Sequence, residues 1–243
     1  MTKRRADEHV ADALGVSRTK AQALIMAGTI RVGDAPVRKS GQSVEVEAAV
    51  SGAAAKPYVS RAAGKLVAAL DAWPVTVAGR TVLDVGASTG GFTQLVLERG
   101  ARAVIAVDVG TGLLVWEFRN DPRVTVLERT DIRKLRKLPL PVDLAVVDVS
   151  FISLRGVLPA MAALLPGRAP VIALFKPQFE VGRTEASRGK GVITDRGVVA
   201  DALDRLRDWL LRNGWSVEGS VASPVKGTKG NQEYLLRLET PAA

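Results

Sequence analysis

The sequence predicts a doubly wound, Rossmann-like α/β domain preceded by a small N-terminal α+β domain. From about residue 58 onward, apolar runs bounded by glycine, aspartate or proline alternate with helical stretches. Runs of Val, Ile, Leu and Ala without polar interruption indicate strands buried on both faces, as in a parallel sheet covered by helices. The length of 243 residues suits one ordinary domain plus a small one.

The small domain is expected over residues 1–49. A helix is predicted at 6–14, and a second begins after Ser17 at its N-cap and ends at Gly28. Short strands are expected at 29–32, 36–37 and 43–46, with a turn at 33–34. Because the stretch 50–57 is rich in glycine and alanine and ends in proline, we interpret residues 50–60 as a linker.

The larger domain is expected over residues 61–243. Its predicted buried strands are 81–87, 103–109, 124–127, 143–149 and 170–175. A longer helix is predicted at about 195–213, followed by strands at 215–222 and 233–239. Because the last two strands are close in sequence, we expect an antiparallel pair at the edge of the sheet.

Composition excludes several chemistries. There is no cysteine and one histidine, His9, so disulfide scaffolds, zinc fingers, iron–sulfur clusters and thiolate nucleophiles are excluded and no metal site is expected. The net charge of +9 suggests a polyanionic partner such as nucleic acid. The charged N-terminus lacks an apolar segment, and no apolar window approaches ~18 residues, so we expect a cytoplasmic protein without a membrane partner. We also expect a monomer.

A glycine-rich turn follows the first long strand. Glycines between a strand and a helix let the backbone approach a ligand closely, and here the spacing matches neither the dinucleotide fingerprint nor the P-loop. Acids end this strand and the next two, and strand-end acids can hydrogen-bond a nucleoside. Each acid alone could be a solvated aspartate, but together they have the arrangement of S-adenosylmethionine-dependent methyltransferases. The candidate donor-binding residues are Asp84, Gly86, Ser88, Gly90, Gly91, Asp108 and Asp131.

The missing cysteines disfavour carbon-five methylation of pyrimidines, which usually needs a cysteine nucleophile. The string DVSF at 148–151 lacks the signature of enzymes that methylate exocyclic base nitrogens. An alcohol acceptor remains, and it needs a base, which can be a lysine. Lys176 ends an apolar strand, Lys65 precedes the sheet and Glu233 opens the last strand; each alone could be a surface charge.

Five strings extend this pattern: YVSRAAGKL, DVGASTGGFT, DVSFIS, FKPQFE and GNQEY. In them Lys65, Asp148, Lys176 and Glu233 resemble the Lys-Asp-Lys-Glu tetrad of FtsJ-like ribose 2′-O-methyltransferases. The segment SRTKAQALIMAGTIRVGDAPV is similar to the RNA-binding domain named after ribosomal small-subunit protein S-four. The two domains together resemble the TlyA family of ribosomal RNA methyltransferases, also described as hemolysins.

The resemblance implies S-adenosylmethionine as methyl donor and a ribose, expected to be a cytidine's, in ribosomal RNA or a ribosomal subunit as acceptor. Lys176 would be the general base, Lys65 and Glu233 would position the ribose, and Asp148 would align the reacting groups. The short termini resemble family members that modify only the large subunit. One departure from the family is Arg5-Ala6-Asp7, where Arg-Leu-Asp is common.

Basic residues on the small domain and beside the expected site are candidates for phosphate contacts. Through residue 56 the chain carries nine basic and six acidic residues, so affinity would depend on clustering rather than on total charge. The candidates are Arg4, Arg5, Arg18, Lys20, Arg31, Arg38, Lys39, Arg188, Lys190, Lys226 and Lys229. Two other functions stay open at this point: a noncatalytic RNA-binding or ribosome-assembly factor, and a membrane-active hemolysin.

Overall fold

The structure, a computed structural model, describes residues 2–26, 28, 30–51, 58–182, 185, 187, 189 and 191–242. The chain divides into two compact units, Met1–Pro57 and Tyr58–Ala243. Most of the expected linker, residues 52–57, lies outside the described residues. Residues 58–60, also interpreted as linker, belong to the second unit, where the Val59 amide donates to Oε1 of Gln94 at 2.8 Å.

The first unit packs helices α1 (Ala6–Leu14) and α2 (Arg18–Met26) around a small apolar core. Both helices lie where the sequence predicts them, and Gly33 opens the expected tight turn with φ 57°. Its strands are β1 (Lys3–Arg5), β2 (Arg31–Val32), β3 (Ala35–Pro36), β4 (Ser43–Glu45) and β5 (Val50–Ser51). Strand β1 pairs with β4, and β5 pairs with β2 although its residues were interpreted as linker.

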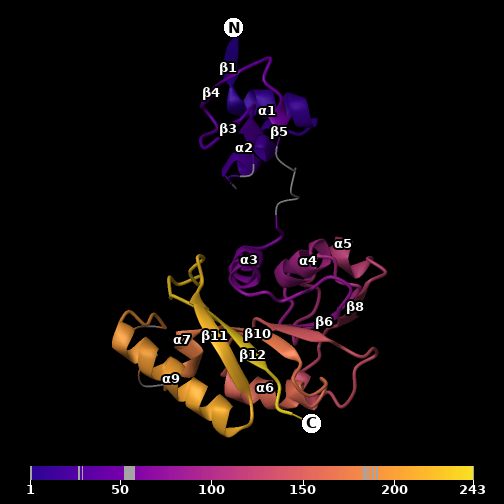
Figure 1. Cartoon of the computed structure of the whole chain (residues 1–243), viewed down its shortest axis with the longest axis vertical. Coiled ribbons are helices and arrows are strands. Elements are labelled where there is room, and N and C mark those ends of the chain that lie inside the picture. The colour runs from indigo at the N-terminus through magenta and orange to yellow at the C-terminus, as the bar shows by residue number, and fades with distance from the viewer. Residues whose placement is uncertain are drawn as a thin grey trace. The chain divides into compact units, whose positions relative to one another are not determined.

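The second unit is built on a seven-stranded sheet with the order β11-β12-β10-β9-β6-β7-β8 (Figure 1). The strands are β6 (Thr81–Val85), β7 (Ala103–Val107), β8 (Val124–Leu127), β9 (Leu144–Val147), β10 (Pro170–Phe175), β11 (Ser216–Ala222) and β12 (Tyr234–Glu239). Strands β6 to β10 are parallel, and β11 and β12 form the predicted antiparallel pair at the edge. The doubly wound α/β prediction is confirmed.

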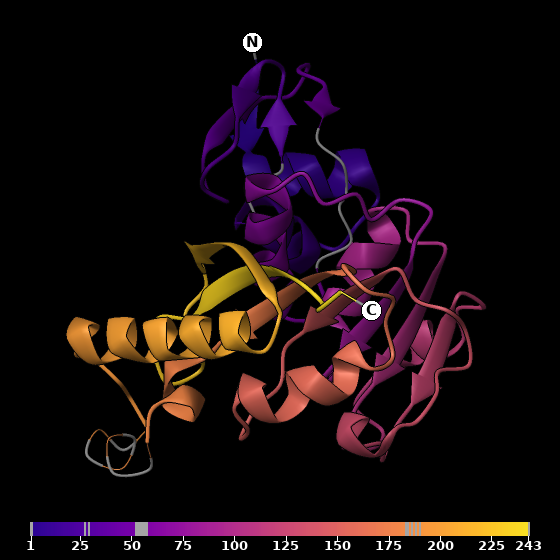
Figure 2. The ribbon, with the colours of Figure 1, turned by 60° about the horizontal axis from the view of Figure 1, so that its bottom comes forward.

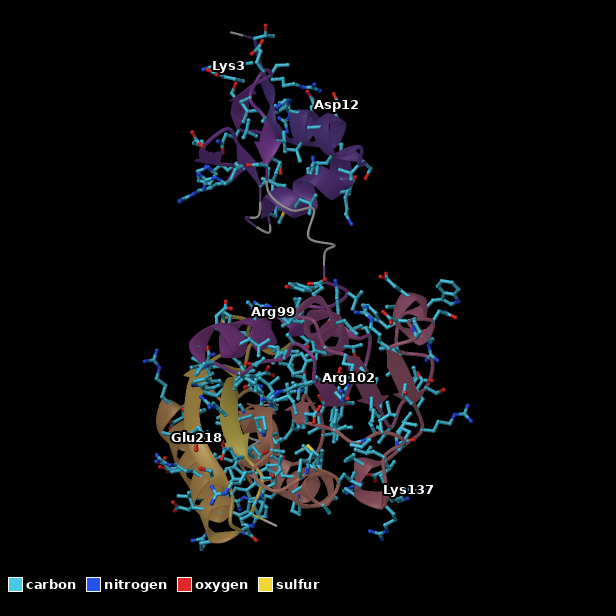
Figure 3. All side chains as sticks on the ribbon, turned by 45° about the vertical axis from the view of Figure 1, so that its right-hand side comes forward. Lys3, Asp12, Arg99, Arg102, Lys137 and Glu218 are labelled. Carbon is cyan, nitrogen blue, oxygen red and sulfur yellow. The ribbon has the colours of Figure 1, made fainter. Side chains whose placement is uncertain are left out.

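Helices cover both faces of this sheet. One apolar layer joins the sheet to α3 (Ala62–Ala72), α4 (Gly91–Glu98) and α5 (Trp116–Arg119). The other joins it to η1 (Ile132–Lys134), α6 (Leu154–Ala162) and α9 (Arg196–Arg212), while α7 (Pro177–Glu180) follows β10 directly. Figure 2 shows α6 and α9 on the same face, and in Figure 3 the exposed Lys137 side chain points away from the packed side chains.

The register of the strands brings distant segments together at the edge of the sheet formed by the carboxyl ends of its parallel strands. Phe175 of β10 pairs with Tyr234 of β12, so the residues just beyond them, Lys176 and Glu233, lie at the same edge. Val85 of β6 pairs with Val147 of β9, which places Gly86 beside Asp148. Because α/β proteins bind ligands outside the carboxyl ends of their parallel strands, this edge is the place to look for a site.

Candidate active site

A cavity of about 590 Å³ opens at this edge, within the second unit. Its wall includes all four residues of the predicted tetrad, Lys65, Asp148, Lys176 and Glu233. The predicted glycine turn forms another part of the wall, through Gly86, Ser88 and Gly91. The structure therefore brings the predicted catalytic residues and part of the predicted donor-binding turn into one cavity.

The first charged pair joins α3 to the start of β12. Lys65 Nζ lies 2.5 Å from Oε2 of Glu233, and their side chains are 11% and 3% exposed. A lysine and a glutamate are seldom this buried unless they are paired, because an unpaired buried charge is costly. The pair fixes two side chains that are 168 positions apart in the sequence.

The second charged pair joins the ends of β9 and β10. Lys176 Nζ lies 2.5 Å from Oδ1 of Asp148 and donates a hydrogen bond to Ser150 Oγ at 2.9 Å. Both charged side chains are largely buried, and both face the cavity. Two buried lysine–carboxylate pairs thus line the same cavity.

The glycine turn packs so tightly that side chains are excluded from it. Gly86 has φ 86°, and a Cβ built there would lie 2.4 Å from the backbone oxygen of Asp148. A Cβ on Gly91 would lie 2.2 Å from Ser60 Oγ. The turn therefore presents backbone to the cavity, as a loop that cradles a ligand does.

The predicted donor-binding acids lie at different depths. Asp84 is fully buried, accepts a hydrogen bond from Thr93 Oγ1 at 2.6 Å and is not part of the cavity wall. Burial raises the pKa of Asp84 to about 7, and its Oδ1 has no hydrogen-bond partner. Asp84 thus lies beneath the turn rather than at its surface.

Asp108 follows β7 and orders the next loops. Its carboxylate accepts hydrogen bonds from the Ser88 amide at 2.9 Å and from the Gly110 amide at 2.7 Å. Asp131 is held by Arg133, whose hydrogen bonds lower the pKa of the Asp131 carboxyl to about 2. Neither acid, nor Gly90, is part of the wall of the cavity.

Several residues of the cavity wall were not predicted. The Phe151 side chain is 91% exposed and packs against Phe179, with ring centroids 5.3 Å apart. Ser150, Gln178 and Asn231 also line the cavity. The strings DVSFIS, FKPQFE and GNQEY contain all five, but aromatic, amide and hydroxyl side chains have no spacing that signals a site.

The predicted RNA-binding residues of the first unit are partly tied to acids. Arg4 pairs with Asp12 at 2.8 Å, while Arg5 and Arg18 both contact the buried Asp7. The hydrogen bonds from Arg5 hold the pKa of the Asp7 carboxyl well below its usual range. Of the other candidates, Arg31, Arg38, Lys39, Lys226 and Lys229 are exposed, Lys20 is half-buried, and Arg188 and Lys190 lie outside the described residues.

Comparison with known proteins identifies the class. The family model described as FtsJ-like methyltransferase matches residues 58–240. This match, the seven-stranded sheet and the cavity at its carboxyl edge define an FtsJ-like methyltransferase. Within that class, the chain belongs to the TlyA family, as its relatives show.

Two named relatives and one solved structure support this assignment. The chain is 45% identical over 237 residues to the 16S/23S rRNA (cytidine-2′-O)-methyltransferase TlyA of Mycobacterium tuberculosis, covering 96% of this chain and 88% of the relative. It is 37% identical to the 23S rRNA (cytidine-2′-O)-methyltransferase TlyA of Campylobacter jejuni, covering 73% and 69%. A solved structure described as a hemolysin, from Streptococcus thermophilus, is 36% identical, with TM-score 0.73 and coverage of 99% and 90%.

The hemolysin names raise the question of a membrane-spanning segment. In the part of the chain that the structure describes, no helix is both long and apolar enough to cross a membrane.

Proposed function

We propose that the protein transfers a methyl group from S-adenosylmethionine to the 2′-hydroxyl of a cytidine in ribosomal RNA. The observation that carries the proposal is the pair of buried lysine–carboxylate contacts, Lys65–Glu233 and Lys176–Asp148, on one cavity with the glycine turn. The names of the relatives from Mycobacterium tuberculosis and Campylobacter jejuni support the acceptor.

The residues of the turn fit the donor. At Gly86 and Gly91 a side chain would collide with Asp148 and Ser60, so glycine is needed for the close packing of the turn. The Ser88 amide donates to the Asp108 carboxylate, a group suited to ribose hydroxyls. Asp84 would act from beneath the turn, and Gly90 and Asp131 from outside the cavity wall. When bound, S-adenosylmethionine supplies an electrophilic methyl group on a cationic sulfur.

The tetrad supplies the base and the alignment. In the transfer the ribose oxygen would bond to the methyl carbon as the bond from that carbon to the donor sulfur breaks, leaving S-adenosylhomocysteine. The hydroxyl proton would pass to Lys176 Nζ, later to be released to solvent. Asp148 then pairs with the ammonium that forms, while Lys65 and Glu233 offer a donor and an acceptor that hold the ribose.

The RNA would be held by both units. The first unit is proposed to be an S-four-type RNA-binding domain, and Lys229, which lines the cavity, would meet a phosphate near the reacting nucleotide. The exposed ring of Phe151 is available to stack on an unpaired base. Action on cytoplasmic ribosomal RNA fits these features, and restriction to the large subunit stays a prediction.

Transfer of labelled methyl from S-adenosylmethionine to purified ribosomal subunits tests the proposal. We expect incorporation with the wild-type protein and loss of at least about a thousandfold in turnover with Lys176→Ala. Calorimetry should show that the variant still binds the donor, because Lys176 is not part of the glycine turn. Lack of incorporation by a wild-type protein that binds the donor would point to a noncatalytic RNA-binding factor.

A further inference from the structure

The two segments that carry the Lys176–Asp148 pair are joined a second time, away from the pair. Ser153 Oγ donates to Oε2 of Glu180 at 2.6 Å, and the Leu154 amide donates to Oε1 of Glu180 at 2.7 Å. Glu180 is the last residue of α7, the single turn that Lys176 begins. The loop from 149 to 153 is therefore fastened to α7 at both ends, by Ser150 on Lys176 and by Ser153 and Leu154 on Glu180.

Helix capping alone does not account for this contact. The amino end of α6 already has a local cap, since Ser153 Oγ accepts from the Arg155 amide. Glu180 comes from another segment and is substantially buried, and burial raises the pKa of its carboxyl. A surface carboxylate would stabilise the helix end without that desolvation cost.

The loop 149–153, between these two sets of hydrogen bonds, has an unfavourable backbone conformation. Phe151 has φ 65°, a left-handed value that is uncommon for a bulky residue. Such a conformation persists only where its surroundings enforce it. Here the hydrogen bonds of Ser153 and Leu154 to Glu180 hold the end of the loop. Releasing them would free the loop to relax and carry Ser150 and Asp148 away from Lys176.

We propose that Glu180 is a positioning residue of the methyl-transfer site. By accepting hydrogen bonds from Ser153 and Leu154 at the amino end of α6, it holds the loop 149–153 so that Ser150 and Asp148 contact Lys176. The inference rests on the proposed function, because it concerns the geometry of the proposed base. The turn from Lys176 to Glu180 is itself rigid, with the Phe179 amide donating to the Lys176 oxygen at 2.9 Å. A change at Glu180 is thereby transmitted to Nζ of Lys176.

A graded series of variants tests the proposal. Ser153→Ala removes one of the two hydrogen bonds to Glu180 together with the local cap on the Arg155 amide. Glu180→Gln keeps an acceptor for the Leu154 amide, and Glu180→Ala removes both hydrogen bonds to residue 180. We expect turnover at saturating donor and ribosomal subunit to fall in that order, by at least about tenfold in Glu180→Ala. Donor affinity by calorimetry should stay within about twofold of wild type, because neither Ser153 nor Glu180 lines the cavity.

Asp143→Ala is the matched control. Asp143 is a carboxylate that accepts from a backbone amide, that of Thr81, at 2.9 Å, but it lies at the opposite edge of the sheet. It should lower the melting temperature without lowering turnover. Double variants with Ser150→Ala add a second readout: if Glu180 acts through this loop, the losses from Glu180→Ala and Ser150→Ala should combine to less than their product.

Turnover within twofold of wild type in Glu180→Ala would overturn the inference. So would a loss of turnover that stands in the same proportion to the loss of melting temperature in Glu180→Ala and in Asp143→Ala. If Glu180→Ala does not fold, Ser153→Ala and Glu180→Gln decide the question. Turnover equal to that of the wild type in both variants would also overturn the inference. Absence of methyl transfer by the wild-type protein would instead refute the proposed function.

Discussion

Replacing Asp84 by asparagine tests the electrostatics beneath the glycine turn. The carboxyl is fully buried, one oxygen accepts from Thr93 Oγ1 and the other has no partner. Burial raises its pKa from 3.8 to about 7. At a pH between these two values the carboxyl is therefore protonated in the folded state and ionised in the unfolded chain. The stabilisation that the protonated Asp84 carboxyl gives to the folded state is therefore fully present below about pH 4 and is lost as pH rises through about 7.

The size of the effect follows from these two pKa values. Between about pH 5 and about pH 8 the wild-type protein should lose roughly 2–3 kcal/mol of unfolding free energy through this group. Asparagine keeps an acceptor for Thr93, is never charged and lacks this loss. Urea unfolding of both proteins at both pH values should show the variant gaining that amount relative to wild type. An equal difference in unfolding free energy at the two pH values would refute the reasoning.

Three further substitutions test other parts of the molecule. Gly86→Ala should weaken donor binding by at least about tenfold, because its Cβ would meet the backbone oxygen of Asp148; unchanged affinity in a normally folded variant would argue against a tight turn. Phe151→Ala should change stability by less than about 0.5 kcal/mol and raise KM for the ribosomal subunit while donor affinity holds; an unchanged KM would exclude a contact with RNA. Asp7→Asn should lower the melting temperature of the first unit, and the difference from wild type should shrink below about pH 4. The reason is that Arg5 keeps the Asp7 carboxyl ionised, and the stabilisation from this ionised carboxyl is lost as pH falls. A difference in melting temperature that does not depend on pH would contradict this.

The central strands of the second unit could be predicted because they are runs of buried apolar residues, and its longest helix could be predicted because the sequence supplies an amino-terminal cap. Asp195, for example, caps α9 within one residue of the predicted start. Strand β1 could not, since Lys3–Arg5 is wholly basic and becomes a strand by pairing with the distant β4. Strand β5 falls in the predicted linker because the stretch 50–57 is rich in glycine and alanine and ends in proline, and its two residues become a strand only by pairing with β2.

The tetrad was found through the resemblance, and its pairing follows from the sheet register rather than from the sequence. That Lys176 lies opposite Glu233 depends on the antiparallel addition of β12 to β10. The depth of Asp84 depends on packing under α4 and is not visible in a string that shows only a strand-end acid. Glu180 ends the string FKPQFE, and its role could not be predicted because its partners, Ser153 and Leu154, lie in a different segment of the sequence.

The central claim is that the methyl group goes to a ribose oxygen of ribosomal RNA. The most direct measurement is mass mapping of nucleosides from both ribosomal subunits after incubation with the protein and S-adenosylmethionine, with Lys176→Ala as the control. The account predicts a new 2′-O-methylcytidine that the control lacks, in the large subunit alone if the prediction on subunits is right. A methyl group on a base, or no new methyl group in RNA treated with folded, donor-binding protein, would contradict it.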